Sequence, residues 1–199
     1  MDAQLLFTIT MAKLRDQNTA LLLIDLQKGF SEEAHWGGNR NNRDAEDKAL
    51  QLLETWRSLE LPIFHIIHSS QDPNSLLHKS HPGFEMIEAL KPKNDEPLII
   101  KDVNSAFIGT DLKERLDAQG INKLVIVGLT TNHCISTTTR MAGNLGFDVL
   151  LISDATATFD REGLNGQVYS SEMIHETALA SLHKEFAEVI DSTSLLEMV

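Results

Sequence analysis

The cysteine at position 134 is the only one in the 199-residue sequence, and its position suits a nucleophile. It closes the segment Gly128-Leu-Thr-Thr-Asn-His-Cys134, which follows the apolar run Leu124–Val127, a pattern typical of a short buried strand. Apolar residues then recur at helical spacing from Ile135, so we expect a helix to begin here. The N–H groups in the first turn of a helix favour a thiolate. They can also receive the oxyanion that forms when a thiolate attacks a carbonyl.

Two charged residues stand at the ends of other expected strands. Asp25 is the last residue of the apolar run that starts at Thr19, and Lys101 follows the run Leu98–Ile100. A carboxylate can take the proton of a thiol and later return it to a leaving amine. An ammonium can hold that carboxylate in place and add positive charge near the thiolate. We therefore predict a catalytic set of Asp25, Lys101 and Cys134. The alternative is a structural ion pair beside a cysteine that acts as a small buried hydrophobe.

Strand-like and helix-like segments alternate along the chain. Strands are expected at 19–25, 63–67, 98–100, 124–127, 147–153 and 186–190. Helices are expected to begin near 44, 111, 135 and 170, the first with a buried stripe of Leu50, Leu53, Trp56 and Leu59. This alternation predicts a three-layer α/β/α sandwich with a mostly parallel central sheet, a Rossmann-like arrangement. Ligands bind beyond the carboxyl ends of the strands in such sheets, where the predicted catalytic set is also expected.

Composition narrows the classes of partner and compartment. The formal net charge of −12 disfavours nucleic acid and anionic membranes as partners, because both require clustered Lys and Arg. No apolar run is long enough to span a membrane. A single cysteine cannot form an internal disulfide, so we expect a reducing, cytoplasmic location. We expect one domain over residues 1–199, with residues 1–15 as an N-terminal extension outside the core fold.

Four segments of the chain, taken together, resemble the isochorismatase-like cysteine hydrolases, a group that includes nicotinamidases and N-carbamoylsarcosine amidohydrolase. The resemblance covers residues from about 19 to 190 and is carried by Leu23–Gln27 with Phe30, Lys101–Phe107, Gly128–Cys134 and Ser153–Thr156. It implies the isochorismatase-like hydrolase fold and a triad of Cys134, Asp25 and Lys101. It also implies a cis peptide between Leu129 and Thr130, with the backbone N–H groups of Thr130 and Cys134 forming an oxyanion hole.

The same resemblance implies an activity. Isochorismatases proper cleave a vinyl ether and need no cysteine in the family's pattern, so Cys134 favours hydrolysis of a C–N bond. We expect a small amide or ureide as the substrate, a thioester intermediate, and no cofactor. The resemblance also implies a homo-oligomer, either a dimer or a tetramer.

The region that would hold a metal in nicotinamidases departs from their pattern. Those enzymes use a compact Asp-x-His pair with a second His downstream, and no Asp-x-His occurs in residues 64–73 here. We therefore predict no metal site. We interpret the nearby candidates as solvated or hydrogen-bonded loop residues: His65, His68, Asp72, His78 and His81.

Aromatic residues in the loops leaving the first and third strands are candidates for the substrate pocket. They are Phe30, Trp36 and Phe107, and apolar walls with few polar groups suit a small ligand. Packing in the core or between subunits explains the same residues equally well. His133, next to Cys134, is an alternative base in a Cys–His pairing, although adjacent residues in a strand or turn point apart.

Two readings compete with an amidohydrolase. One is a catalytically idle member of the same fold that acts as a binding or scaffold protein. The other is redox sensing by the lone thiol of Cys134, which requires a partner cysteine from another chain. Fast alkylation of Cys134 near neutral pH would favour the enzyme, and a thiol as slow as that of an unfolded peptide would favour the scaffold.

Overall fold

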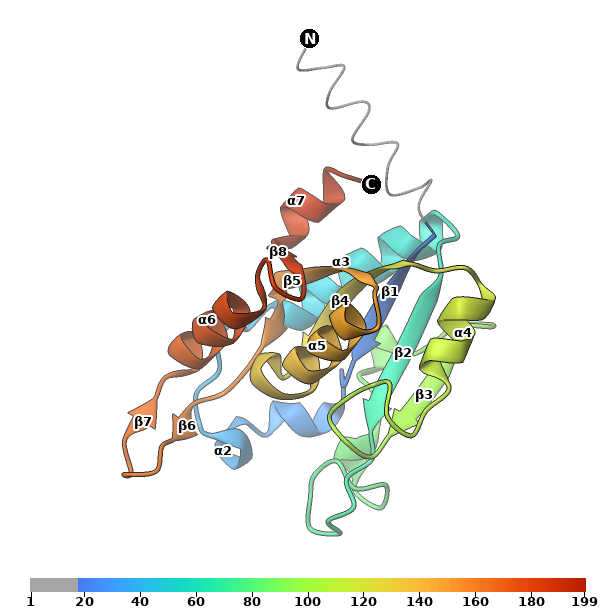
Figure 1. Cartoon of the computed structure of the whole chain (residues 1–199). Helices are drawn as coiled ribbons and strands as arrows, with labels where there is room; N and C mark the ends of the chain where they lie inside the picture. The colour runs from blue at the N-terminus through green and yellow to red at the C-terminus, as the bar shows by residue number, and fades with distance from the viewer. Residues whose placement is uncertain (1–17) are drawn as a thin grey trace.

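A six-stranded parallel sheet forms the centre of the molecule. The computed structural model describes residues 18–199, so the expected extension at residues 1–15 lies outside the described residues. The strand order is β3-β2-β1-β4-β5-β8, and every neighbouring pair is parallel (Figure 1). The strands are β1 Thr19–Ile24, β2 Ile63–His68, β3 Leu98–Lys101, β4 Lys123–Leu129, β5 Asp148–Ala157 and β8 Glu188–Ile190. A separate antiparallel hairpin joins β6 Arg161–Glu162 to β7 Val168–Tyr169.

Helices cover both faces of the sheet, which confirms the three-layer prediction. On one face lie α3 Ala45–Ser58 and the short α7 Ser192–Leu196, and on the other α4 Leu112–Ala118, α5 Ser136–Asn144 and α6 Ser171–Leu182. Short turns and one short helix fill the connections: η1 Lys28–Ser31, α2 Glu33–Trp36, η2 Pro82–Phe84, η3 Glu88–Leu90 and η4 Thr131–Ile135. No helix among residues 18–199 has the length and apolar character needed to cross a bilayer.

Strand β1 is buried along its whole length because helices cover both of its faces. Its side chains alternate between two cores. Leu21 and Leu23 pack in the core that contains Trp56 of α3, and Leu22 packs in the core that contains Leu112 of α4. This two-sided burial explains why the strand appears in the sequence as a continuous apolar run without alternation.

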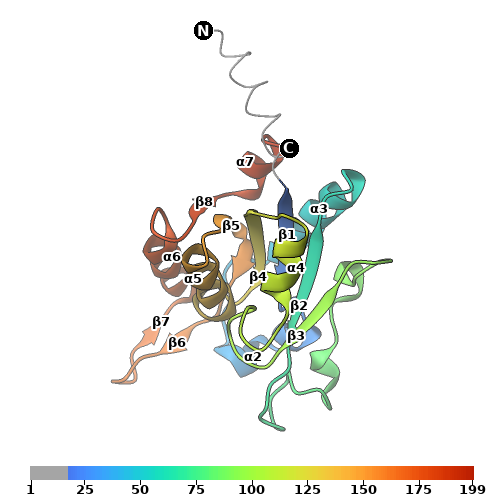
Figure 2. The same cartoon turned by 45° about the vertical axis from the view of Figure 1, so that its right-hand side comes forward.

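The strand order reverses between β1 and β4. The chain builds β1, β2 and β3 outward in one direction and then returns to add β4 on the other side of β1. Crevices that bind ligands form at such a switch point, beyond the carboxyl ends of the strands. Figure 2 shows α2 and the β6–β7 hairpin gathered at this end of the sheet.

The buried stripe of the helix expected to begin near residue 44 differs from the prediction. Helix α3 buries Ala45, Ala49, Leu52, Leu53 and Trp56, whereas Leu50 and Leu59 are only partly buried. The true stripe follows i, i+4, i+7, i+8 and i+11, so the small alanines belong to it and a strict three-residue step drifts off the face.

The C-terminal half also departs from expectation in detail. Strand β5 runs on to Ala157, beyond the end of the strand expected at 147–153, after a register shift opposite Ile126–Gly128. The β6–β7 hairpin and α7 have no counterpart in the sequence prediction, since elements of two to five residues carry too little periodicity to be recognised.

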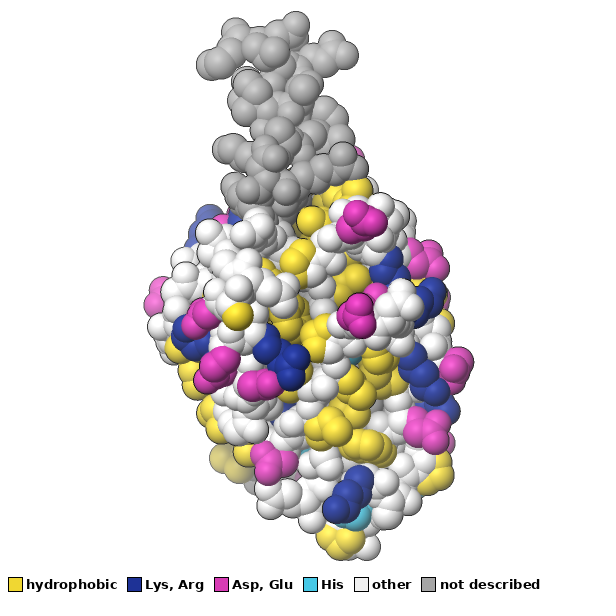
Figure 3. Space-filling view, turned by 90° about the vertical axis from the view of Figure 1, so that its right-hand side faces the viewer, with side chains coloured by type: hydrophobic (Ala, Val, Ile, Leu, Met, Phe, Trp, Pro, Cys, Tyr) yellow, Lys and Arg dark blue, Asp and Glu magenta, His cyan; other side chains and the backbone are white. Residues whose placement is uncertain are grey.

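The edge of the sheet at β3 carries exposed apolar side chains. Leu98 is 45% and Ile100 is 53% exposed, and hydrophobic side chains group on the face of the molecule seen in Figure 3. Apolar patches at sheet edges are commonly covered by a neighbouring subunit. The expected dimer or tetramer stays a prediction.

Candidate active site

Asp25 lies directly after β1 in a tight turn. Its φ is 54°, in the left-handed region that non-glycine residues seldom adopt outside special sites. The turn is held because its N–H donates to the carbonyl of Ile66 (2.8 Å) and its carbonyl accepts from the N–H of Gln27 (2.9 Å). The Gln27 side chain in turn bonds both the N–H and the carbonyl of His68 on β2. The end of β1 is thus fixed to the end of β2.

Lys101, the last residue of β3, brings the three predicted catalytic residues together. Its ammonium donates to Asp25 Oδ2 at 2.8 Å and to Cys134 Sγ at 3.2 Å, and it lies 3.2 Å from His68 Nδ1. The side chains of Lys101 and Asp25 are both fully buried. One cation therefore contacts both the expected base and the expected nucleophile.

Cys134 sits in η4, a single wide turn that leads into α5. The carbonyl of Thr130 accepts hydrogen bonds from the N–H groups of His133 (3.1 Å) and Ile135 (3.3 Å), which closes the turn around the cysteine. The peptide bond between Leu129 and Thr130 is cis, at the position that the family resemblance indicates.

Gly128 explains why this segment can approach β1 so closely. Its φ is +121°, and a Cβ atom added here would lie 1.9 Å from the carbonyl oxygen of Ile24. Only glycine fits, because the close approach of β1 and β4 leaves no room for a side chain. This contact brings Asp25, which follows Ile24, next to the segment that ends at Cys134.

The surroundings of Cys134 and Lys101 shift the pKa values of both side chains. Burial and the nearby Asp25 carboxylate raise the pKa of the Cys134 thiol, and Lys101 opposes that rise only in part. Burial lowers the pKa of Lys101, but Asp25 and Cys134 raise it by more, so the ammonium stays charged. The net effect favours the neutral thiol, whereas the helix terminus was expected to favour the thiolate.

The two carboxylate oxygens of Asp25 differ in their hydrogen bonding. Oδ2 accepts from Lys101, whereas Oδ1 is buried without a hydrogen-bond partner among residues 18–199. Ligand atoms of Asp25 and Cys134 lie within 4.8 Å of each other. The carboxylate can thus accept a proton from the sulfur while its other oxygen stays bound to the ammonium.

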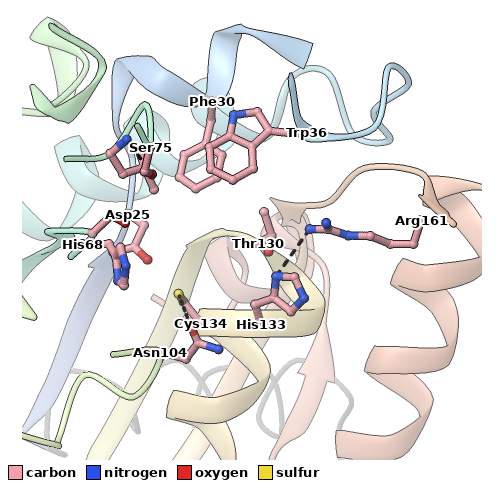
Figure 4. Close-up of a pocket in the computed structure, with 12 residues that line it drawn as sticks. Asp25, Phe30, Trp36, His68, Ser75, Asn104, Thr130, His133, Cys134 and Arg161 are labelled. Atoms are coloured by element: carbon pink, nitrogen blue, oxygen red, sulfur yellow. Dashed lines mark hydrogen bonds between the residues drawn. The ribbon is translucent and has the colours of Figure 1, made fainter. Parts of the chain in front are cut away.

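A cavity of about 220 Å³ opens above Cys134. Phe30 and Trp36, both predicted as pocket residues, form one wall with ring centroids 4.8 Å apart. Figure 4 shows these rings on the side of the cavity opposite Cys134, with Thr130 between. The Trp36 indole N–H donates to the carbonyl of Gly29 at 2.8 Å, so the wall is tied to the turn that follows β1.

Phe107 does not line this cavity, and its predicted role in the pocket is wrong. Its ring stacks on Phe147 at 5.8 Å and packs against the core on the α4 and α5 side of the sheet. The N–H of Ala106 donates to Thr138 Oγ1 on α5, which ties this part of the loop to the helix.

Six residues that line the cavity were not predicted as pocket residues: His68, Ser70, Ser75, Leu77, Asn104 and Arg161. Asn104 accepts from the Cys134 sulfur through Oδ1 at 3.6 Å. Asn104 lies inside the Lys101–Phe107 segment, so its position was a usable signal. Arg161 comes from the β6–β7 hairpin, for which the sequence offers no motif.

His133 points away from the nucleophile. Its Nδ1 lies 3.4 Å from Arg161 Nη2, and Figure 4 shows the ring turned toward that guanidinium. Burial and the positive charge of Arg161 lower the pKa of His133. No hydrogen bond joins His133 to Cys134 in the part of the chain that the structure describes, so the geometry favours Asp25 as the base.

Four of the five residues considered as metal ligands lie in separate local hydrogen bonds, and His65, which was interpreted as a loop residue, is instead buried in strand β2. His65 is buried against Glu96 (2.8 Å), His78 bonds Ser80, His81 accepts from the N–H of Gly83, and Asp72 accepts from the N–H of Asn74.

The exception is His68, which stands near Asp25 and Cys134 with ligand atoms within 4.8 Å of one another. Lys101 Nζ, however, lies within 3.2 Å of an atom of each of these three residues. The atoms that could ligate a metal are therefore already arranged around the Lys101 ammonium. Its positive charge opposes the binding of a second cation at the same point.

Comparison with known proteins places this site in a family. The isochorismatase domain model matches residues 19–194. The chain belongs to the isochorismatase family. An uncharacterized isochorismatase family protein of Bacillus subtilis, YrdC, is 46% identical over 181 residues, covering 91% of this chain and 96% of that protein. Nicotinamidase 3 of Arabidopsis thaliana is 28% identical over 197 residues, covering 91% and 90%.

The fold of the isochorismatase family is confirmed by a solved structure. A hydrolase from Chromobacterium violaceum assigned to the isochorismatase family aligns with a TM-score of 0.87 and 38% sequence identity, covering 92% of this chain and 94% of that one. The chain is therefore an isochorismatase-family hydrolase, and Asp25, Lys101 and Cys134 form a triad-like arrangement at the switch point of its sheet.

Proposed function

We propose that the protein is a cysteine hydrolase that cleaves the C–N bond of a small amide or ureide through a thioester intermediate. One observation carries the proposal: the Lys101 ammonium contacts both the Asp25 carboxylate and the Cys134 sulfur beneath a cavity. A purely structural Asp–Lys pair would not need a sulfur as a third partner, nor would it explain why the second carboxylate oxygen of Asp25 is buried without a hydrogen-bond partner among residues 18–199.

The proposed reaction begins with proton transfer. Asp25 takes the thiol proton, and the thiolate of Cys134 attacks the substrate carbonyl to form a tetrahedral oxyanion. The backbone N–H groups of Thr130 and Cys134 stabilise that oxyanion, and Thr130 lines the same cavity. The C–N bond then breaks, and Asp25 gives its proton to the departing ammonia or amine.

A water molecule completes the cycle. Asp25 takes a proton from the water as the oxygen attacks the thioester, the C–S bond breaks, and the sulfur is protonated again. Lys101 keeps its charge throughout, because Asp25 and Cys134 raise its pKa above the usual value despite the burial that lowers it. Its ammonium therefore balances the negative charge as that charge moves between the carboxylate and the sulfur.

Cavity size supports a small substrate. The volume of about 220 Å³ is below the range of roughly 300–1,000 Å³ that pockets for drug-sized ligands occupy. A nicotinamidase is among the relatives, but this chain lacks the Asp-x-His pair in residues 64–73, so a different small amide or ureide is proposed. We also propose a cytoplasmic location and a homo-oligomer, as expected from the sequence, and no cofactor.

An ammonia-release screen tests the reaction. Purified protein is incubated with small primary amides, ureides and nicotinamide, beside the Cys134→Ala and Cys134→Ser variants. At least one compound is expected to release ammonia with the wild type and with neither variant. Full turnover by Cys134→Ala on the same compound would refute the thioester route. Absence of turnover across the panel would favour the idle scaffold.

A further inference from the structure

His68 and Lys101 stand opposite each other at the ends of two neighbouring strands. They are register partners in the parallel pair of β2 and β3, and each is the last residue of its strand. The Lys101 ammonium lies 3.2 Å from His68 Nδ1. An ammonium has three hydrogens to donate and no lone pair with which to accept, so this contact is a hydrogen bond only if Nδ1 is the acceptor.

The contact with His68 occupies the third N–H of the ammonium. The other two N–H groups donate to Asp25 Oδ2 at 2.8 Å and to Cys134 Sγ at 3.2 Å. The Lys101 side chain is fully buried, so an N–H without a protein partner would cost free energy. Three acceptors from separate elements therefore hold the ammonium at one point between the carboxylate and the sulfur.

The backbone of His68 is fixed by the side chain of Gln27. The Gln27 amide oxygen accepts from the N–H of His68 at 2.9 Å, and its amide nitrogen donates to the carbonyl of His68 at 3.0 Å. The same nitrogen donates to the carbonyl of Phe84 at 2.8 Å. The ring itself lines the cavity, and Figure 4 shows it next to Asp25 at the side where Cys134 lies.

The surroundings of the ring favour its neutral form. The titratable groups that face it are Asp25, Lys101, Asp102 and Cys134. Burial and the nearby Lys101 ammonium lower the pKa of His68. The carboxylates of Asp25 and Asp102 raise this pKa by less, as does a hydrogen bond with the backbone of Val103. A neutral ring whose Nδ1 accepts a hydrogen bond carries its proton on Nε2.

We propose that His68 is a positioning residue, whose neutral ring accepts from the Lys101 ammonium and so holds that ammonium against the sulfur of Cys134. This inference rests on the role of Cys134 as nucleophile in the proposed function. Without the acceptor, the ammonium would have a free buried N–H and could turn toward Asp25 Oδ1, which has no hydrogen-bond partner among residues 18–199. The sulfur would then lose the positive charge that lowers the pKa of its thiol.

The nitrogen that carries the ring proton can be measured directly by NMR. In protein labelled with ¹⁵N-histidine, two-bond correlations between the ring nitrogens and the carbon-bound protons distinguish both neutral tautomers from the charged ring. The signals of His68 are identified by their absence in His68→Asn. The ring is expected to be neutral with its proton on Nε2 at neutral pH. It should stay mostly neutral at pH 6.5, since its pKa lies below that ordinary value.

Alkylation of Cys134 by iodoacetamide at a fixed neutral pH tests the positioning. The sulfur attacks the iodine-bearing carbon, and iodide leaves. His68→Leu removes the acceptor and is expected to lower the rate by about 10-fold or more. His68→Asn offers a carboxamide oxygen near the place of Nδ1, so the rate is expected to fall by less than about 3-fold.

His183 provides the matched control for these variants. Its Nδ1 also accepts a hydrogen bond, from the N–H of Val189 at 3.1 Å, but it is exposed and does not line the cavity. The same two substitutions, His183→Leu and His183→Asn, are expected to leave the alkylation rate unchanged. Thermal unfolding of each variant shows whether it is folded.

Three results would overturn the assignment. They are a proton on Nδ1 or a charged ring of His68 at neutral pH, a His68→Leu variant alkylated as fast as the wild type, and a His68→Asn variant as slow as His68→Leu. If His68→Leu does not fold, the NMR measurement on the wild type decides.

Both measurements are separate from the ammonia-release screen, because neither needs an amide substrate. The expected tautomer and alkylation rates in a protein that hydrolyses no amide would leave the positioning role of His68 standing and remove the amidase. Amide hydrolysis by a protein in which His68→Leu alkylates at the wild-type rate would do the reverse.

Discussion

The ammonium of Lys101 lies 2.8 Å from Asp25 Oδ2, although 76 positions separate the two residues in the sequence. They stand at the ends of β3 and β1, with β2 between them, so the lysine side chain reaches across the end of an intervening strand. Both side chains are fully buried. We expect this buried pair to contribute both to the stability of the fold and to the chemistry of the site.

Removing the ammonium is expected to destabilise the protein. Lys101→Met leaves the Asp25 carboxylate buried without its counter-charge, which costs about 3–5 kcal/mol of unfolding free energy. Denaturant unfolding at neutral pH measures the loss. Lys113→Met is the matched control, because the exposed pair of Lys113 with Asp117 contributes at most ~0.5 kcal/mol. Similar losses in the two variants would show that the buried pair has no special role.

Removing the carboxylate is expected to make the thiol more acidic while it stops turnover. Burial and Asp25 raise the pKa of Cys134, so Asp25→Asn takes away one of these causes and the pKa falls. Alkylation of Cys134 should then reach its half-maximal rate at a lower pH than in the wild type. Amide turnover should fall by about 100- to 10,000-fold, since the base is gone.

Asp117→Asn, which changes an exposed carboxylate, serves as the control for that experiment and should leave the alkylation profile in place. A half-maximal pH that rises in Asp25→Asn would mean that the carboxylate supports the thiolate and does not oppose it. The assignment of Asp25 as the proton acceptor would then have to be withdrawn.

Glu96 is expected to make stability depend on acid pH. Burial raises its pKa, but hydrogen bonds from Arg57, the Lys93 N–H and His65 outweigh burial and lower it to about 2 from the usual 4.5. A carboxyl with a lowered pKa in the folded state stabilises the fold above about pH 4.5, and that contribution is lost as the pH falls toward 2.

Urea unfolding of the wild type and Glu96→Gln across this range measures the effect. The variant should be less stable at neutral pH, and the gap between the two proteins should close as the pH approaches 2. Glu88→Gln, at a side chain that is 80% exposed, is the control. A gap of constant size at every pH would assign the effect to shape and not to charge.

Gly128 is expected to tolerate no side chain. In Gly128→Ala the new Cβ would lie 1.9 Å from the Ile24 carbonyl oxygen, so β1 and β4 must separate at a cost of about 3 kcal/mol or more. Gly146→Ala is the control. Gly146 also has a positive φ of +89° but open space around it, so it isolates the backbone strain of about 1–2 kcal/mol. Thermal unfolding that is equal in the two variants would show that the close approach is unimportant.

The sequence alone determined the local pattern of this protein. Fully buried parallel strands produce continuous apolar runs, so β1, β2, β4 and the start of β5 could be placed within a few residues, with Asp25 and Lys101 at strand ends. In a parallel sheet the ends share one edge, so convergence with Cys134 followed from topology without any contact map. Shorter elements such as β6, β7 and α7 had too few residues to produce a period.

Only the tertiary structure decided the environment of that edge. In the folded chain Phe30 and Trp36 line the cavity, and Arg161 lies beside His133. Phe107 packs instead in the core on the α4 and α5 side of the sheet. The protonation of Cys134 likewise depends on burial, which no local pattern encodes. Periodicity records which face of an element is apolar, whereas a pocket and its charge arise from contacts between elements, and those exist only after the chain has folded.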